Sequence, residues 1–422
     1  MINNLIDILK AEVKPAMGCT EPVAVTLAAA KARVLGGHES ISKAFVRVSP
    51  NIFKNGMSVG IPKIDAVGIG PAAGVGLLAG DPDMGLKIFE TVCEGSLVNL
   101  EDLMDRGIIE VAIADTCEKV YIEVEISSPK GMSRAVLSGM HNHFSQLEVN
   151  GALLLDDPFV QADASYDIAT YSLDEIIDTV IHAEEGVFDF LLEGLEMNRR
   201  ISEMGRNEKL GLGIGYNTKK AVEDGKLGCD LATRAMYYTA AASDARMSGI
   251  ALPVMSSNGS GNNGLTAILP LLAYKDIYHT PDGKMAKALA LSHLINCYIK
   301  RGIGRLSALC SCGISAATGA SAAIAWLEGG DREVMEGTIQ NMIANLSGMI
   351  CDGAKNSCAI KLATAASTGV HAAVWSKYGS MSGHLEGIVG KTATDSITNL
   401  GTLSQEGMQL TDHTILNIMR SM

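Results

Sequence analysis

The chain has 422 residues, of which 47% are hydrophobic and 19% are charged. This length and composition indicate a well-buried globular protein with two or three domains. The formal net charge of −13 argues against a nucleic-acid partner, since phosphate binding requires concentrated Lys and Arg. Aromatic residues make up only 5% while glycine occurs 45 times, which is typical of closely packed helices with many small-residue contacts.

The N-terminus has no signal-peptide pattern, because residues 1–10 lack a basic stretch followed by an apolar core and a cleavage site. Nine cysteines, an odd number, fit best in a reducing cytoplasm. Residues 306–327 carry no charge, but they are rich in small residues and poor in large apolar ones. A bilayer helix needs about twenty mainly apolar positions. We therefore expect a buried helix here, a cytoplasmic protein and no membrane partner.

Helical apolar spacing covers residues 2–13 and 22–35, and the segment between them contains a proline and a glycine that break the pattern. Cys19, Thr20 and Glu21 directly precede the proline that opens the second helix. Free backbone N–H groups at such a helix start can bind a carboxylate. The alternative is an ordinary connection between two helices.

The next part of the chain has strand patterns. Residues 44–49 alternate as in a strand, and residues 68–74 open a helix of small residues. Residues 108–113 and 120–126 alternate strictly around a turn, which predicts an antiparallel pair with one solvated face.

From Leu173 onward the apolar residues recur at helical spacing. We place a domain boundary near residue 190, with an α+β domain at residues 1–190 and an all-helical domain at residues 191–422. The predicted fold class of the chain is therefore α+β.

A polar segment rich in Gly and Asn interrupts the second half at residues 253–264. These residue types tolerate positive φ and let a ligand approach the backbone. The segment leads into an apolar helix at residues 265–274, which predicts an anion site at the helix start. The alternative is a plain surface loop. The candidate binding residues are Ser256, Ser257, Asn258, Gly259, Ser260, Gly261 and Asn262.

Four of the cysteines in the helical part lie within about fifty residues of one another, namely Cys310, Cys312, Cys351 and Cys358. In a chain without a secretory signal, such thiols are candidate ligands of a soft metal. Their spacing fits neither a zinc ribbon, since no Cys-x-x-Cys occurs, nor a ferredoxin. An iron–sulfur site with irregular spacing and an open iron remains, and an open iron suits Lewis-acid chemistry. The alternative is buried structural cysteine, which behaves as a small hydrophobe.

Five motifs in this order resemble those of the L-cysteine desulfidases, a family related to the iron–sulfur L-serine dehydratases. They are Met17-Gly-Cys-Thr-Glu-Pro22, Gly68-Ile-Gly-Pro-Ala-Ala-Gly74, Ser256-Ser-Asn-Gly-Ser-Gly261, Leu309-Cys-Ser-Cys312 and Cys351-Asp-Gly-Ala-Lys-Asn-Ser-Cys358. The resemblance covers essentially the whole chain. It implies that the first domain corresponds to the α/β, sandwich-like β domain of the dehydratases and the second to their helical α domain.

The resemblance also implies a [4Fe–4S] cluster bound by Cys351, Cys358 and one thiol of the pair Cys310 and Cys312. Because residues i and i+2 of a helix point in different directions, we favour Cys310. Cys19 stands where the dehydratases have a Ser-Ser-His-Thr substrate loop. It is therefore an active-site candidate, either as a fourth ligand in the resting state or as a proton acceptor.

The activity that the resemblance implies is β-elimination from a small amino acid, L-cysteine, which yields sulfide, ammonia and pyruvate. Thr20, Glu21 and the 256–262 segment would hold its amino and carboxylate groups. One alternative is dehydration of L-serine or L-threonine on the same scaffold. A second is a non-catalytic iron–sulfur sensor, and a third is a helical protein with structural thiols. We expect a homo-oligomer, although no sequence pattern indicates the number of subunits.

Overall fold

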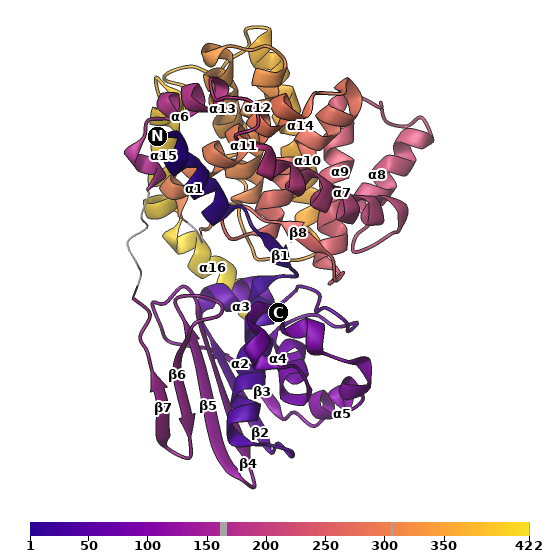
Figure 1. Cartoon of the computed structure of the whole chain (residues 1–422), viewed down its shortest axis with the longest axis vertical. Coiled ribbons are helices and arrows are strands. Elements are labelled where there is room, and N and C mark those ends of the chain that lie inside the picture. Colours follow the sequence, from indigo (N-terminus) through magenta and orange to yellow (C-terminus); the bar gives the residue numbers. More distant parts are fainter. Residues whose placement is uncertain (161–166, 305–306, 422) are drawn as a thin grey trace.

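The computed structural model describes residues 1–160, 167–304 and 307–421, which form an α+β structure with two bodies (Figure 1). One body contains a six-stranded sheet and the other is mainly helical, so the predicted fold class is confirmed. The strands are β1 (Pro15–Met17), β2 (Lys43–Val48), β3 (Ile109–Ile113), β4 (Tyr121–Ser128), β5 (Gly131–Ser138), β6 (Phe144–Val149), β7 (Ala152–Asp156) and β8 (Pro253–Met255).

The α-helices make up most of the second body and cover one face of the sheet in the first. In chain order they are α1 (Ile2–Glu12), α2 (Thr20–Gly36), α3 (Pro50–Gly56), α4 (Ile69–Leu78), α5 (Leu100–Asp105), α6 (Leu173–Ile181), α7 (Leu192–Asn207), α8 (Ile214–Glu223), α9 (Leu231–Met247), α10 (Gly261–Tyr278), α11 (Asp282–Ile303), α12 (Ala317–Leu327), α13 (Arg332–Leu346), α14 (Cys358–Lys377), α15 (Ala393–Thr402) and α16 (Gln409–Arg420).

The six-stranded sheet has the order β3-β2-β4-β5-β6-β7. β2 and β3 are parallel, and all other neighbours are antiparallel. Alternating residues of β4, namely Ile122, Val124 and Ile126, are fully buried, whereas Glu123 and Glu125 point to the opposite face. The apolar face packs against α2, so one face of the sheet is covered and the other is open.

The antiparallel pair predicted from residues 108–113 and 120–126 is wrong, although both segments are strands. β2 lies between β3 and β4 and is hydrogen-bonded to both. Alternation of apolar residues identifies a strand but not its neighbour in the sheet. The connection from β2 to β3 contains α3, α4 and α5, and a connection of this length returns the chain in the parallel direction.

The two bodies have separate hydrophobic cores. One core contains the buried apolar residues between Val23 and Leu147. The other contains Leu5, Ile8 and Leu9 of α1 together with buried residues from Ile168 to Leu400. Figure 1 shows α1 packed in the helical body, although it begins the chain. The division into domains at residue 190 stays a prediction, because core packing does not measure independent folding.

Small residues bring the helices close together, as the composition predicts. A Cβ at Gly76 of α4 would lie 2.3 Å from the carbonyl oxygen of Thr26 in α2. A Cβ at Gly205 of α7 would lie 2.0 Å from the carbonyl oxygen of Ala241 in α9. Such separations are too short for any side chain, so glycine is required at both helix crossings.

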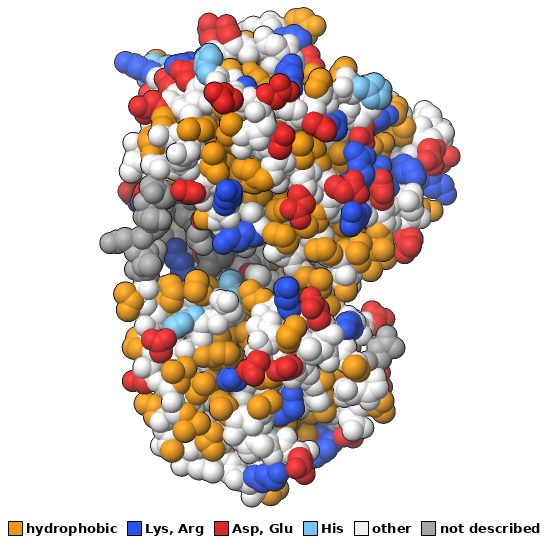
Figure 2. All heavy atoms as spheres, viewed as in Figure 1, with side chains coloured by type: hydrophobic (Ala, Val, Ile, Leu, Met, Phe, Trp, Pro, Cys, Tyr) orange, Lys and Arg blue, Asp and Glu red, His pale blue; other side chains and the backbone are white. Residues whose placement is uncertain are grey.

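The uncharged segment at residues 306–327 is largely the buried helix that was expected. Cys312–Ala316 is a π-helical turn that continues into α12, and almost every α12 residue is buried. Leu306 lies outside the described residues. None of the helices in the described part of the chain combines the length and hydropathy that a membrane crossing requires. Figure 2 shows acidic and basic side chains intermixed over the visible face of both bodies.

Three contacts join segments of the chain at the junction of the sheet-containing body and the helical body. β1, which links α1 to α2, pairs antiparallel with β8. Ser58, after α3, forms an isolated parallel β-bridge with the backbone of Lys355. The C-terminal helix α16 reaches α3, where the buried Lys54 ammonium lies 2.5 Å from the Asp412 carboxylate (Figure 1). The cysteine-rich segment of residues 351–358 therefore lies where the two bodies meet.

Candidate active site

A short backbone ladder holds Cys310 and Cys351 side by side. The residues that precede them, Leu309 and Ile350, form an antiparallel bridge. The Cys310 N–H donates to the carbonyl of Met349 at 2.8 Å. Two segments that are distant in sequence therefore bring two thiols together.

Cys358 adds a third thiol at the first residue of α14, with its Sγ 3.6 Å from the carbonyl oxygen of Gly353. Burial, followed by the nearby Cys310 thiol, raises the pKa of Cys358 to about 11 and also raises the pKa of Cys351. A hydrogen bond with Cys312, together with burial, raises the pKa of Cys310 well above its usual value. The bridge between Leu309 and Ile350 places Cys310 beside Cys351, and Cys358 bonds to Gly353, two residues after Cys351. Cys310, Cys351 and Cys358 therefore form one group, the cysteine cluster.

Lysines surround the segment that carries this cluster. Asp352 forms ion pairs with Lys355, at 2.6 Å, and with Lys361. Burial alone would raise the pKa of Asp352, but hydrogen bonds from these lysines hold it down to about 2. Lys54 and Lys361 both lower the pKa of Cys351, against the effect of burial. The positive surroundings favour the thiolate, which is the form of cysteine that binds metals.

Within the described ranges, no three His, Cys, Asp or Glu side chains converge as ligands of one metal ion. An iron–sulfur cluster makes a different demand, because its thiolate ligands bind separate iron atoms. The cysteine cluster offers three sulfur donors in largely buried, positively charged surroundings. This donor chemistry fits an anionic iron–sulfur cluster. The ligand roles of Cys310, Cys312, Cys351 and Cys358 stay predictions.

The helical argument that separated Cys310 from Cys312 is wrong, because Cys310 does not lie on a helix. Cys310 belongs to the bridged segment, and Cys312 begins the π-helical turn. The Cys312 Sγ lies 4.0 Å from the Ser260 Oγ, whereas Cys310 acts on the pKa values of Cys351 and Cys358. The observed positions thus favour Cys310 as the ligand for a different reason.

Cys19 lies next to the cysteine cluster. Gly18 turns the chain after β1 with φ +68°, a conformation that favours glycine, and Cys19 then caps α2. Its side chain is 4% exposed and belongs to a small apolar group with Val59, Met247 and Cys358. The position at the first turn of a 17-residue helix places free backbone N–H groups beside the thiol.

Thr20 and Glu21 form the first turn of α2, and both are partly exposed. The Thr20 Oγ1 donates to the Glu21 carboxylate at 3.4 Å. Glu21 raises the pKa of Cys19, in addition to the larger effect of burial. The three predicted catalytic residues therefore lie together, although the structure does not test their roles.

The polar loop predicted at residues 253–264 is shorter than expected, because α10 begins at Gly261 and the last four residues are helical. Ser260 explains this helix start, since its Oγ accepts from the N–H of Asn263 at 3.4 Å. Gly264 is required, because a Cβ there would lie 1.9 Å from the carbonyl oxygen of Met255. The N-terminus of α10 therefore opens directly beside the Ser and Asn residues of this segment.

Hydrogen bonds anchor the 256–262 segment on both sides. The Ser256 Oγ donates to the carbonyl of Lys14 at 2.6 Å, just before β1. The carbonyl of Asn258 accepts from the Lys300 ammonium at 2.8 Å. Gly259, with φ +73°, forms the turn between them and α10.

Two residues that the motifs did not identify hold Ser257 in place. The His293 Nδ1 lies 3.0 Å from the Ser257 Oγ, and the Asn296 Nδ2 donates to the same oxygen at 3.0 Å. All three side chains are fully buried. Both partners come from α11, where they are polar residues in an otherwise apolar pattern. That pattern contains no signal that distinguishes a positioning histidine from an ordinary core residue.

We expect His293 to make the unfolding free energy depend on pH below neutrality. Burial lowers the pKa of His293 from 6.5 to about 4. Above pH 6.5 the ring is neutral in both states and contributes nothing to this dependence. As the pH falls from 6.5 towards 4, only the unfolded state takes up the proton, so stability decreases. The decrease is at most about 1.4 kcal/mol per pH unit.

Urea unfolding at several pH values would check this prediction with His293→Gln, which should flatten the dependence between pH 4 and 6.5. His384→Gln, which changes an exposed histidine, is the matched control and should retain the native slope. An unchanged slope in His293→Gln would contradict the assignment of a buried neutral ring.

Arg246, near the end of α9, is the other important residue that the motifs did not identify. Its Nη1 donates to the Asn262 Oδ1 at 3.1 Å, and its Nη2 donates to the carbonyl of Gly18 at 2.9 Å. Burial raises the pKa of Cys19 to about 11, and the Arg246 charge acts in the opposite direction. A Cβ at Gly261 would lie 2.4 Å from the Arg246 Nε, which explains the glycine. Arg246 thus joins the two segments that were predicted as separate anion sites.

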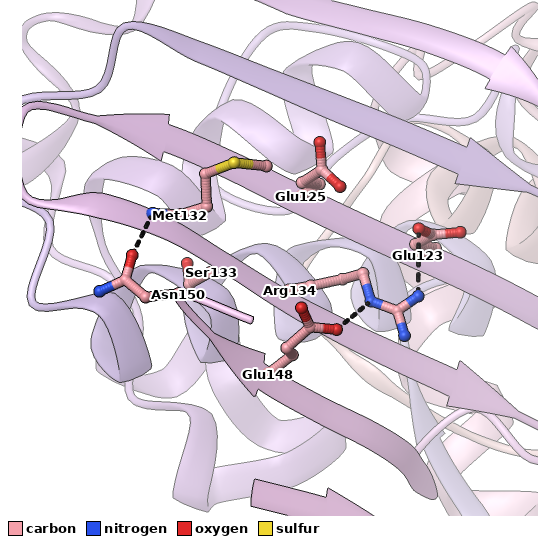
Figure 3. A pocket seen from close by; sticks show the side chains of 7 residues that line it. All are labelled: Glu123, Glu125, Met132, Ser133, Arg134, Glu148 and Asn150. Atoms are coloured by element: carbon pink, nitrogen blue, oxygen red, sulfur yellow. Dashed lines mark hydrogen bonds and ion pairs between the residues drawn. The ribbon is translucent and has the colours of Figure 1, made fainter. Parts of the chain in front are cut away.

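A cavity of about 250 Å³ lies elsewhere, on the open face of the six-stranded sheet (Figure 3). Glu123 and Glu125 of β4, Arg134 of β5 and Glu148 of β6 line it. Figure 3 shows Arg134 between two carboxylates, with its nitrogens 3.6 Å from Glu123 and 3.5 Å from Glu148. These side chains pair across strands and stabilise the sheet. None of the predicted site residues lines this cavity.

Comparison with known proteins covers nearly the whole chain. Residues 85–417 match the model of a family described as serine dehydratase alpha chain. The chain is 47% identical over 425 residues to a UPF0597 protein of Clostridioides difficile (strain 630), with 99% of both chains covered. A UPF0597 protein of Alkaliphilus oremlandii is also 47% identical over 423 residues, which covers 100% of this chain and 98% of the relative. A UPF0597 protein of Desulfotalea psychrophila is 37% identical over 426 residues, with 98% of both chains covered.

Proposed function

The chain belongs to the serine dehydratase alpha chain family, and from this premise we propose that it eliminates sulfide from L-cysteine. The family indicates an iron–sulfur, serine dehydratase-like lyase, and L-cysteine as the substrate is the finer proposal. The observation that carries the proposal is the grouping of the cysteine cluster with Cys19 and the N-terminus of α2. Three sulfur donors, a fourth thiol and an anion-binding helix start are the groups that such a reaction requires.

We propose Cys310, Cys351 and Cys358 as the thiolate ligands of a [4Fe–4S] cluster. With three protein ligands, the bound cluster supplies an iron that acts as a Lewis acid. Lys54 and Lys361 favour the thiolate form of Cys351, since both lower its pKa against the larger effect of burial. The cysteine cluster is largely buried, which strengthens the interaction of these lysines with the thiolate.

The substrate-binding residues of the proposal come from two helix starts. The N-termini of α2 and α10 provide backbone N–H groups and a partial positive charge for a carboxylate. The proposed role of Glu21 is to accept a hydrogen bond from the amino group, and its carboxylate, in the first turn of α2, is partly exposed. Ser260 and Asn262 provide hydroxyl and amide groups at the start of α10.

Cys19 is the proposed proton acceptor. As a thiolate it takes the α-proton, and the electron pair of the Cα–H bond forms the Cα=Cβ bond. The Cβ–S bond breaks, and its electron pair leaves with sulfide. The aminoacrylate then tautomerises to an imine, which water hydrolyses to pyruvate and ammonia. Burial raises the pKa of Cys19 to about 11 and the charge of Arg246 only partly opposes this rise, so the thiolate, when formed, is a strong base beside a cation.

An anaerobic assay with the iron-loaded protein tests this proposal. Sulfide, ammonia and pyruvate should form from L-cysteine in equal amounts, and the activity should decay in air because an open iron is accessible to oxidants. A loaded protein that forms none of these products from L-cysteine would refute the proposed reaction.

We expect Cys19→Ser to lower kcat by about 100-fold or more, because a general base typically contributes 10²–10⁴-fold. The iron content should remain that of the native protein if Cys19 acts as the base. Cys93→Ser, which changes an exposed cysteine, is the matched control and should retain activity. Loss of iron together with activity in Cys19→Ser would instead assign Cys19 as a ligand.

A further inference from the structure

Arg246 is a buried cation without a matching buried anion. Its side chain is 7% exposed. Arg246 hydrogen-bonds to the neutral oxygens of Asn262 and Gly18 and to the Cys19 sulfur, and within the described ranges no Asp or Glu forms an ion pair with it. Its Nε has no hydrogen-bond partner there either. Because a buried charge without a partner is costly, proteins normally pair it with an opposite charge. Burial raises the pKa of the neighbouring Cys19 thiol to about 11, so this thiol is a poor counter-charge and the structure favours an anionic ligand beside Arg246.

The guanidinium retains donors for such an anion. It carries five N–H groups, of which one binds Asn262, one binds Gly18 and one binds the Cys19 sulfur, so two remain. A planar guanidinium matches a carboxylate with two parallel hydrogen bonds, and such charged pairs are stronger than neutral ones.

The surroundings of Arg246 also favour an anion. Gly18 directly precedes the cap of α2, and Asn262 lies in the first turn of α10. The positive ends of two long helices therefore lie beside the same guanidinium. Arg246 is close enough to Cys19 for its charge to lower the pKa of that thiol. An anion bound here would lie beside the proposed proton acceptor.

We propose that Arg246 binds the α-carboxylate of the substrate and restricts the site to amino acids with a free carboxylate. The identity of the substrate rests on the proposed function, whereas the carboxylate requirement rests on the geometry of Arg246. Two hydrogen bonds hold the guanidinium between the two helix starts, so the bound carboxylate is fixed relative to Cys19. Amines that lack the carboxylate, and amino acids whose carboxylate is an amide, should bind weakly.

The test compares two inert ligands on the anaerobic, iron-loaded protein. L-2-aminobutyrate has a methyl group in place of the cysteine thiol, and propylamine lacks the carboxylate in addition. Neither undergoes elimination, so calorimetry measures binding without turnover. We expect the native protein to bind L-2-aminobutyrate about 30-fold more tightly or better, because losing one partner of a buried charge pair costs 2–5 kcal/mol.

Arg246→Gln should abolish this preference, so that the two ligands bind within about threefold of each other. Arg246→Lys retains the charge but not the planar fork, so it should show a reduced preference and is available if the Gln variant does not fold. Arg33→Gln is the matched control, because Arg33 also donates to backbone carbonyls but lies near the other end of α2. It should retain the native preference.

Equal binding of the two ligands to the native protein would overturn the proposal, as would an equal loss of affinity for both in the Arg246 variants. The latter result would mean that Arg246 only ties the two segments together. A preference that depends on Arg246, in a protein that does not convert L-cysteine, would support this inference and refute the proposed reaction.

Discussion

Replacement of Cys351 or Cys358 by serine is expected to remove most of the iron and labile sulfide from the protein, and the lyase activity with them. A serine hydroxyl is a hard, neutral oxygen and does not substitute for a soft thiolate on iron. Even residues outside the ligand sphere alter metal affinity by 10–100-fold, so loss of a ligand should cost at least about 100-fold. Iron and acid-labile sulfide, measured after anaerobic reconstitution, check the prediction.

The same iron and sulfide measurement distinguishes Cys310 from Cys312 as the third ligand. Cys310→Ser should lose the iron–sulfur cluster as the Cys351 and Cys358 variants do. Cys310 is buried, and its thiol raises the pKa of both Cys351 and Cys358. Cys312→Ser should retain most of its iron, since the Cys312 thiol lies 4.0 Å from the Ser260 hydroxyl and is a hydrogen-bond partner of Cys310 rather than a proposed ligand. Cys117→Ser, which changes an exposed cysteine, is the control for reconstitution. Full iron in Cys351→Ser or Cys358→Ser would contradict the proposed ligand set.

Sequence motifs predict part of this site because metal and anion sites require particular residue types. The thiols at positions 310, 312, 351 and 358 could be named in advance as candidate ligands, a role that stays a prediction, since cysteine is the soft ligand of proteins. Their grouping could not be derived from spacing, because it depends on the bridge between Leu309 and Ile350. Pairing between segments distant in sequence is a property of the folded chain, which no local pattern encodes.

Arg246 and His293 were missed for a related reason. Each lies in a helix, and neither belongs to a Gly-, Cys- or Ser-rich motif. Their importance comes from their partners, which are the carbonyl of Gly18 and the hydroxyl of Ser257. A single arginine or histidine in a helical pattern predicts nothing until the fold shows what it contacts.

For the fold, too, the sequence predicts features that depend on one segment but not those that depend on contacts between distant segments. Helical periodicity and strand alternation predict the α+β class, because each depends on residues within one segment. The position of β2 between β3 and β4 depends on the long connection through α3, α4 and α5. The helical conformation of residues 261–264 was missed because Gly and Asn suggest a loop, whereas the Ser260 cap and packing against β8 favour a helix.

The proposed site should prefer L-cysteine to L-serine. We expect kcat/KM for L-cysteine to exceed that for L-serine by about 100-fold or more on one anaerobic preparation, measured by pyruvate formation. Thiolate leaves carbon more readily than hydroxide, whose departure normally requires protonation by an acid. A general acid contributes 10²–10⁴-fold, so a site without one should handle serine poorly.

The segment from Gly18 to Glu21 and the buried His293 offer no good acid for the serine hydroxyl. The segment from Gly18 to Glu21 contains no histidine. His293 reaches only Ser257, and burial lowers its pKa to about 4, so its ring is neutral at neutral pH. The Glu21 carboxylate is partly exposed and accepts a hydrogen bond from the Thr20 hydroxyl at 3.4 Å.

Glu21→Gln provides the control for this comparison. If Glu21 only orients the amino group, the substitution should lower kcat/KM for both amino acids by a similar factor. A selective loss of serine activity would instead identify Glu21 as an acid whose proton assists the departing hydroxyl. L-serine turnover equal to or above that of L-cysteine in the native protein would refute the desulfidase proposal. The family and the α+β fold would be unaffected, because both rest on evidence independent of the leaving group.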